Sequence, residues 1–583
     1  MSAAPRDPRH DPTADEPTGS DPTGYAREYA AAVLRRGRVP MEPADFTPDW
    51  GDAPRKGKFF PGPDLLPLPL PLATSSEATT APGAATTATV QAGLHPPAEV
   101  PPGRGFALPT LAGMLHDSYA VIGRRLGVQA NTDLATLPSY PRANWYRGTA
   151  SGGGLYPCGI YWCCGPTGPL TPGVYYYSTP HHALAPLLVG DVAGVVRAAL
   201  GELPAAARTD QFLIVDVKLW QNAFKYNSFS YHAVTMDVGT TLQTWRIWAR
   251  ANGLRIEPAL WFDEPPLNRL LGIDAEVAGV FAVVPLDWDH DGPPARDATG
   301  HQPPSPAEST WPESTWPATT WPAPAVRHRD RERSRRVLTF SAPARMRRAT
   351  LGRLADRPSP ADLRAAAATA VPDGPWPRLP DPPPLTMDVR TALRRRRSSF
   401  GRFEARVPLE AAALAALLAA SAGTGFDVDT LGPGTRPLVK MYAFVNHVRH
   451  VPPGEYEYDP VRNALRPIRT GPPGEFLQRN YFLANYNLEQ AAAVLVPTVR
   501  TAAVLQVAGD RGYHLVNATI GAVAQTCYTA ASALGVGCGV ALGFDNVSYV
   551  EELGLTGTDE YPLLIMLVGH ERPDPADFNY ELV

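Results

Sequence analysis

The chain has 583 residues, of which 44% are hydrophobic, and a formal net charge of −4. At roughly 150 residues per domain, this length predicts two to four folded units with large apolar cores. The small net charge gives no indication of nucleic-acid binding, and no apolar run approaches the roughly 20 residues that a membrane span requires.

The cysteines are few and lack the CxxC spacing of metal sites; they are Cys158, Cys163, Cys164, Cys527 and Cys538. Neither a disulfide framework nor a metal site is therefore predicted. The first residues, MSAAPRDPRHDPTADEP, lack the basic and then apolar pattern of a secretory signal. Together these observations predict a cytoplasmic protein with no membrane partner.

The chain begins with residues 1–24, which are polar and rich in Pro and Asp and are expected to be disordered. An N-terminal extension follows at 25–104. It opens on a short predicted helix at 25–36, and its low-complexity segment 73–96 is expected to be a linker or mobile loop.

Folded domains are expected at 105–290 and 386–583. The segment between them, 291–385, contains the repeat STWPESTWPATTWP and the charge run RHRDRERSRR. This composition favours a tethering linker. Its tryptophans leave open a second interpretation, a strip that docks a partner.

One stretch of the first domain returns in the second. FKYNSFSYHAVTMDVGTTLQTW (224–245) resembles DRGYHLVNATIGAVAQTCYTA (510–530). Each copy places a Tyr-His pair before a Gly and a Gln after it, at equal spacing: His232, Gly239 and Gln243 in the first, His514, Gly521 and Gln525 in the second. The repeat predicts one fold used twice, with the histidines in structural roles.

The two domains also align outside this stretch. PGVYYYSTPHHALAPL (172–187) matches PGEYEYDPVRNALRPI (453–468), and GLRIEPALWFDE (253–264) matches GVGCGVALGFDN (535–546). Strands and apolar-faced helices alternate without a strict βαβ order, which predicts the α+β class.

Four groups of residues are candidates for chemistry. In RRRRSSFGRF (394–403), clustered arginines beside serines suit a phosphate, since Arg binds its oxygens in pairs and Ser adds a hydroxyl donor. A solvated helix end is the plainer interpretation.

The second group is RGTASGGGLYP (147–157). Its consecutive glycines either let the backbone approach a flat ligand closely or form an ordinary turn. This segment has neither P-loop nor dinucleotide-fold spacing.

The third group is GVGCGV (535–540), whose glycines would expose backbone N–H groups to a ligand. Cys538 has no activating neighbour there and is expected to be structural.

The fourth group is Lys225-Tyr226. An ammonium favours a phenolate, so Lys225 would lower the Tyr226 pKa from its usual value near 10 and make a general base. Neighbours on a helix do not face each other, so this coupling requires an irregular backbone.

In their order and double occurrence, these motifs resemble the SagB-type branch of the flavin-dependent nitroreductase family, the azoline dehydrogenases of ribosomal peptide maturation. The first domain resembles that branch through LPTLAGMLHDSYAVIGRRLG (108–127), the SGGGLYP loop and the Lys-Tyr helix. The second resembles a general nitroreductase domain through RRSSFGRF and GVGCGVALGF.

The resemblance implies a fold and a cofactor. Enzymes of this family are obligate dimers with FMN in the interface. Two copies in one chain are therefore expected to form two tandem nitroreductase-like domains, each a central mixed or antiparallel sheet flanked by helices, paired as an intrachain pseudo-dimer. A higher oligomer is left open.

The resemblance also implies site residues. The phosphate would be held by Arg396, Arg397, Ser398 and Arg402, with Arg572 as a second cation. Ser151, Gly152 and Gly153 would lie along the flavin ring, opposite Gly537, Cys538, Gly539 and Val540. Lys225 and Tyr226 would be catalytic. The mirror site has GRRLGVQ (123–129) in place of the phosphate motif and Arg511-Gly512 in place of Lys-Tyr, so one working and one derelict site are expected.

The implied activity is an FMN-dependent oxidation of thiazoline or oxazoline rings to thiazoles or oxazoles in a ribosomally made precursor peptide. Tyr226 would be the base, tuned by Lys225 or sharing the role with it, and a hydride would pass to the flavin. A cyclodehydratase would be the partner that makes the azoline. Two alternatives stay open: an NAD(P)H-dependent reductase of dehydroamino acid, nitro or quinone substrates, and a flavin-less subunit that binds a peptide.

Overall fold

The computed structural model describes residues 24–71, 88–95, 105–127, 144–289, 323–432, 436–573 and 577–582. The predicted disorder before residue 24, most of the low-complexity segment 73–96 and the Trp-Pro repeat lie outside these ranges. None of the helices in the described ranges is both long and apolar enough to cross a membrane.

Two sheets that share the order of five strands form the two halves of the molecule, and β1 extends the first at one edge while β13 extends the second at the other. The first runs β1-β6-β5-β4-β7-β8 and the second β11-β10-β9-β12-β15-β13, with β14 paired to β12. All of these pairings are antiparallel. The bounds in the first are β1 Leu66–Pro67, β4 Cys158–Cys164, β5 Gly173–Ser178, β6 Ala183–Val189, β7 Gln211–Lys218 and β8 Ala278–Pro285. The bounds in the second are β9 Val439–Val445, β10 Gly454–Asp459, β11 Ala464–Thr470, β12 Ala493–Arg500, β13 Gly537–Ala541, β14 Glu560–Pro562 and β15 Ile565–Gly569.

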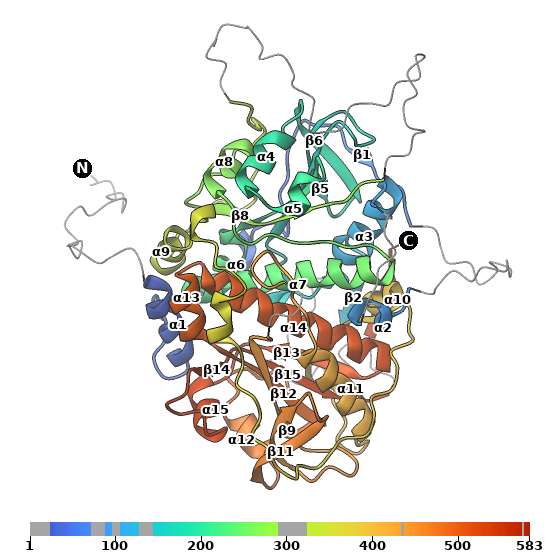
Figure 1. The fold of residues 1–583 in the computed structure, drawn as a ribbon, viewed down its shortest axis with the longest axis vertical. Coiled ribbons are helices and arrows are strands. Elements are labelled where there is room, and N and C mark those ends of the chain that lie inside the picture. The colour runs from blue at the N-terminus through green and yellow to red at the C-terminus, as the bar shows by residue number, and fades with distance from the viewer. Residues whose placement is uncertain are drawn as a thin grey trace, which may run out of the picture.

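Two long helices, α7 (Ser230–Ala251) and α14 (Gly512–Leu534), lie between the two sheets and cross the middle of the molecule (Figure 1). A single apolar core takes in residues of both helices and of both sheets. Each long helix follows an eight-residue one, α6 (Leu219–Tyr226) or α13 (Thr501–Ala508). The predicted α+β fold of two tandem domains, paired within one chain, is confirmed.

Shorter helices pack around the two sheets and the two long helices, and the strands β4, β7, β8 and β12 are buried almost throughout. This explains why these strands read as continuous apolar runs rather than alternating ones. The bounds are α2 Val90–Leu94, α4 Ala193–Leu200, α5 Pro204–Ala207, α8 Glu264–Leu270, α11 Ala411–Ala422, α12 Gly474–Arg479 and α15 Asn546–Glu552.

The two long helices cross at the glycines of the repeat. A methyl group on Gly239 would overlap the carbonyl of Ala518 on α14, and one on Gly521 would overlap the carbonyl of Met236 on α7. Only glycine, which has no Cβ, lets the two backbones come this close. The repeated glycines therefore mark the axis that relates the two domains.

The repeated Tyr-His pairs bond to each other across this axis. Tyr231 Oη and His514 Nε2 are 2.6 Å apart, and His232 Nδ1 and Tyr513 Oη are 2.7 Å apart. Burial lowers the pKa of both histidines, so each imidazole is neutral and can exchange one hydrogen bond with a tyrosine. These reciprocal bonds agree with the structural role expected for the histidines.

The two ends of the chain fasten the domains together. In α1 (Tyr25–Arg35), Tyr29 donates to the carbonyl of Ser228 at 2.7 Å and packs edge-on against Tyr513 at 5.5 Å. The C-terminal strand β16 (Asp577–Glu581) pairs with β2 (Gly123–Gly127) of the first domain, which pairs with β3 (Asn144–Tyr146).

The described part of the segment expected to be a linker, 323–385, is packed against both domains. Its helix α9 (Ser341–Ala349) places Arg347 on Glu264 of the first domain. Thr350 accepts from Arg511 of the second domain at 2.8 Å. The remaining α-helices of the described residues are α3 (Leu108–Tyr119) and α10 (Val389–Arg395).

We expect Gly239→Ala to destabilise the protein by about 1–3 kcal/mol, the usual range for overpacking, because the new methyl group would overlap α14. Gly194→Ala in α4 is the matched control, since nothing lies within 4 Å of its added methyl group. The control should leave stability unchanged or raise it by up to about 1 kcal/mol through helix propensity. Urea denaturation measures both; equal stability of the two variants would contradict the close crossing.

Candidate functional site

The glycine loop of the first domain is anchored on α7 by Asp237. Ser151 Oγ donates to Asp237 Oδ2 at 2.7 Å, and the Gly152 amide donates to Oδ1 at 2.8 Å. The Tyr156 amide in turn donates to Ser151 Oγ at 2.8 Å. Burial raises the Asp237 pKa to about 7, against the opposing pull of the two bonds. The loop is thus fixed at its first two residues.

The anchored loop rests on Lys225 and Tyr226. Gly153 has a φ of +63°, and a methyl group there would lie 2.8 Å from Lys225 Nζ and overlap the Tyr226 hydroxyl. The next residue, Gly154, has nearly the same φ of +64°, yet nothing lies within 4 Å of its added methyl group. The structure therefore brings together three residues that the sequence placed in one site.

The backbone at Tyr226 has the irregularity that the Lys-Tyr hypothesis requires. Tyr226 ends α6, and Asn227 follows in a left-handed conformation with a φ of 41°. Lys225 Nζ consequently lies 4.9 Å from the centre of the Tyr226 ring, although the two are neighbours in sequence. The two side chains are therefore close enough to interact.

The predicted direction of the Tyr226 pKa is wrong. Burial raises this pKa, and the charge of Asp237 raises it further. Burial lowers the Lys225 pKa, because it penalises the ammonium. Tyr226 is therefore a protonated phenol near neutral pH, and Lys225 is the better proton acceptor of the two.

The arginine motif reaches across to the first domain. Arg396, just after α10, donates from Nε to the Gly148 carbonyl at 2.8 Å and from Nη2 to the Arg147 carbonyl at 2.9 Å. These carbonyls lie at the start of the glycine loop, so Arg396 ties the motif to that loop. Arg397 forms an ion pair with Glu571.

The remaining predicted cofactor residues of the second domain lie around β13. Ser398 Oγ is 2.8 Å from the Tyr528 hydroxyl, which accepts from the Val540 amide at 3.0 Å. The Arg572 amide donates to the Arg402 carbonyl at 2.8 Å. These contacts place the arginine motif beside the glycine strand.

The glycines of β13 are packed closely rather than open. A methyl group on Gly537 would lie 2.7 Å from Ser399 Oγ, and one on Gly539 would lie 2.8 Å from the Tyr486 hydroxyl. Cys538 is a free, buried thiol whose pKa is raised by burial, which agrees with the structural role expected for it.

Sequence reasoning missed Asp237 and the tyrosines of the second domain. One signal was present: the position equivalent to Asp237 in the repeat is Thr519, so the carboxylate exists in the first copy alone. Lys56 of the N-terminal extension was also missed. Arg147, at the start of the glycine loop, donates to the Lys56 carbonyl at 3.0 Å, which places the extension beside the site.

The equivalents of Lys225 and Tyr226 in the second domain are Val507 and Ala508, not Arg511 and Gly512 as predicted. The left-handed residue that ends each short helix sets the alignment: Asn227 after α6 corresponds to Gly509 after α13. Neither Val507 nor Ala508 can accept a proton, so the second domain has no counterpart of the Lys-Tyr pair.

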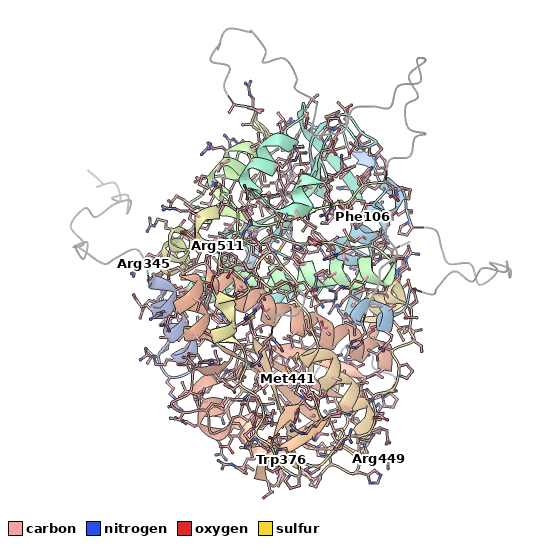
Figure 2. The ribbon with its side chains drawn as sticks, in the orientation of Figure 1. Phe106, Arg345, Trp376, Met441, Arg449 and Arg511 are labelled. Atoms are coloured by element: carbon pink, nitrogen blue, oxygen red, sulfur yellow. The ribbon has the colours of Figure 1, made fainter. Side chains whose placement is uncertain are left out.

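Arg511, a few residues after this pair, is buried in a charged cluster. Arg511 donates to the Leu260 carbonyl at 2.7 Å and forms an ion pair with Glu264, which also holds Arg347. Figure 2 shows Arg511 between the two halves of the molecule. A methyl group on Gly352 would lie 2.6 Å from the Arg511 guanidinium carbon, so the packing there is tight.

Comparison with known proteins agrees with this fold. Residues 435–570 match the model of the nitroreductase family. A "putative nitroreductase" of Methanocaldococcus jannaschii is 33% identical over 154 residues, which cover 25% of this chain and 72% of that protein. The crystal structure of a "putative nitroreductase" from Anabaena variabilis covers 94% of this chain and 100% of its own, with a TM-score of 0.65 at 21% identity.

The chain belongs to the nitroreductase family. Proteins of this family are oxidoreductases that typically use FMN. The likeness to the Anabaena variabilis protein extends over both domains, so the paired arrangement is a fold that a second protein shares.

We expect the free energy of unfolding to fall, relative to Asp237→Asn, as pH rises from about 4 to about 7. The Asp237 pKa is about 7 in the folded protein and about 4 when unfolded, so between these values the folded state binds more protons. The decline should reach up to about 1.4 kcal/mol per pH unit. Urea denaturation across this range measures it; parallel profiles for the two proteins would contradict the buried carboxyl.

Proposed function

We propose that this chain is an FMN-dependent dehydrogenase of the SagB type, which oxidises thiazoline or oxazoline rings in a ribosomally made precursor peptide to thiazoles or oxazoles. The observation that supports this proposal is the contact of Gly153 with Lys225 and Tyr226. This contact places a proton acceptor, Lys225, against the glycine loop. Arg396 of the second domain binds the carbonyls at the start of the same loop, so the arginine motif lies beside it.

The described residues fit FMN. Arg396 and Arg397 beside Ser398 supply the guanidinium and hydroxyl donors that a phosphate requires. Space is open beside Gly154. When bound, FMN would supply the hydride acceptor.

Lys225 is the proton acceptor in the proposed reaction. Oxidation of an azoline to an azole removes one ring proton and one hydride. Because burial lowers the Lys225 pKa, a larger share of its amine is neutral and able to take the proton near neutral pH. Tyr226 stays protonated and can donate a hydrogen bond that orients the ring. This assignment reverses the two roles expected from sequence.

The proposed substrate and partners follow from the reaction. The azoline would arise in a precursor peptide through a partner cyclodehydratase. The N-terminal extension lies beside Lys225 through Lys56, so it is suited to contact the peptide. The two domains are proposed to span 105–290 and 386–583, with the site between them.

The decisive experiment incubates the FMN-supplemented protein with an azoline-containing peptide and follows the loss of two hydrogens by mass spectrometry. We expect activity in the natural protein, a loss of about 100-fold or more in Lys225→Met, in line with removal of a general base, and a turnover that rises with pH through the Lys225 pKa and then levels.

A matched pair of variants tests the geometry in the same assay. Gly153→Ala and Gly154→Ala carry the same backbone strain, since both residues have a φ near +64°. Only the first adds a methyl group against Lys225 and Tyr226, so it alone should abolish turnover. Nitro or quinone reduction with NAD(P)H and no azoline oxidation would instead favour the reductase, and absence of bound flavin would favour the peptide-binding subunit.

We also expect one FMN per chain. Val507 and Ala508 replace the proposed catalytic pair at the mirror position. Flavin absorbance after denaturation, divided by protein concentration, gives the stoichiometry. A value of two per chain would contradict a single working site.

A further inference from the structure

The fold places Arg125, a cation of the first domain, beside the arginine motif of the second domain. It lies in β2, with Asn579 of β16 opposite it on one side and Asn144 of β3 on the other. Its guanidinium lies 4.1 Å from the centre of the Tyr146 ring. Strand pairing on both sides and the ring below fix where this side chain points.

The guanidinium of Arg125 ends beside the motif. Its Nη2 is 3.4 Å from the Arg396 carbonyl, to which it donates. Burial, together with the charges of Arg396 and Arg397, lowers the Arg125 pKa to about 10. Three guanidiniums thus gather where two domains meet, one from the first domain and two from the second.

The three guanidiniums of this cluster differ in whether a carboxylate balances their charge. Arg397 is paired with Glu571. Arg396 donates to main-chain carbonyls, which carry no net charge. In the described part of the chain, no carboxylate forms an ion pair with Arg125. A partly buried group of like charges is unfavourable by itself and becomes favourable when an anion sits among them.

We propose that Arg125 binds the phosphate of FMN together with Arg397, so that the phosphate is held from both domains. This inference rests on the proposed FMN site and adds to it a residue from the strand segment that was expected to be the derelict counterpart of the motif. The guanidinium fork suits paired contacts to phosphate oxygens.

The test compares FMN with riboflavin, which has the same ring and no phosphate. Flavin fluorescence titration gives both dissociation constants for the natural protein and for Arg125→Gln. We expect the variant to bind FMN at least about tenfold more weakly, the usual effect of losing a charge-assisted contact, and to bind riboflavin as before. Loss of affinity for both flavins alike, or for neither, would overturn the proposal.

Arg124→Gln is the matched control. Arg124 neighbours Arg125 on β2, is exposed and lies over Trp145, 5.6 Å from its ring, so its removal should leave both constants unchanged. Arg125→Lys, which keeps the charge and loses the fork, should show an intermediate FMN constant; it replaces the Gln variant if that protein does not fold. Equal FMN binding by Arg125→Lys and the natural protein would overturn the paired phosphate contact.

The outcomes separate the two levels of inference. If the natural protein binds neither flavin, the proposed function fails. If it prefers FMN over riboflavin and the preference survives Arg125→Gln, the phosphate site stands and the role of Arg125 alone is refuted.

Discussion

The close crossing of α7 and α14 is the contact on which the rest of the structure depends. At Gly239 and Gly521 the two backbones meet with no side chain between them. This approach brings the Tyr-His pairs within hydrogen-bonding distance and sets the separation of the two sheets. It also bears on the site, because a wider crossing would separate the arginine motif of the second domain from the carbonyls it binds in the first.

The two halves share the order of five strands and have diverged in what lies between them. On one side are a glycine loop, an amine and an arginine cluster. On the other, Glu264 is buried with Arg347 and Arg511. Such a group is tolerable because the arginines also donate to carbonyls, which offsets part of the loss of hydration. The segment between the domains supplies Arg347, so the segment that connects the copies also takes part in this buried cluster.

Burial decides the chemistry of the Lys-Tyr pair. In a poorly hydrated space both side chains favour their neutral forms, which raises the pKa of a phenol and lowers that of an amine. The carboxylate of Asp237, needed to hold the loop, strengthens the effect on Tyr226. One set of contacts therefore holds the loop in place and makes Lys225, rather than Tyr226, the better proton acceptor.

Much of this architecture can be predicted from local patterns of the sequence. The equal spacing of His232 to Gly239 and of His514 to Gly521 predicts paired copies of one fold, and the motifs predict the groups that meet in the site. The roles of single residues are not local. The partners of Arg396, the packing of residues 323–385 and the burial that raises the Tyr226 pKa depend on how segments far apart in the sequence pack together. Only the folded chain brings those segments together, because hydration and charge act through distance in space rather than along the sequence.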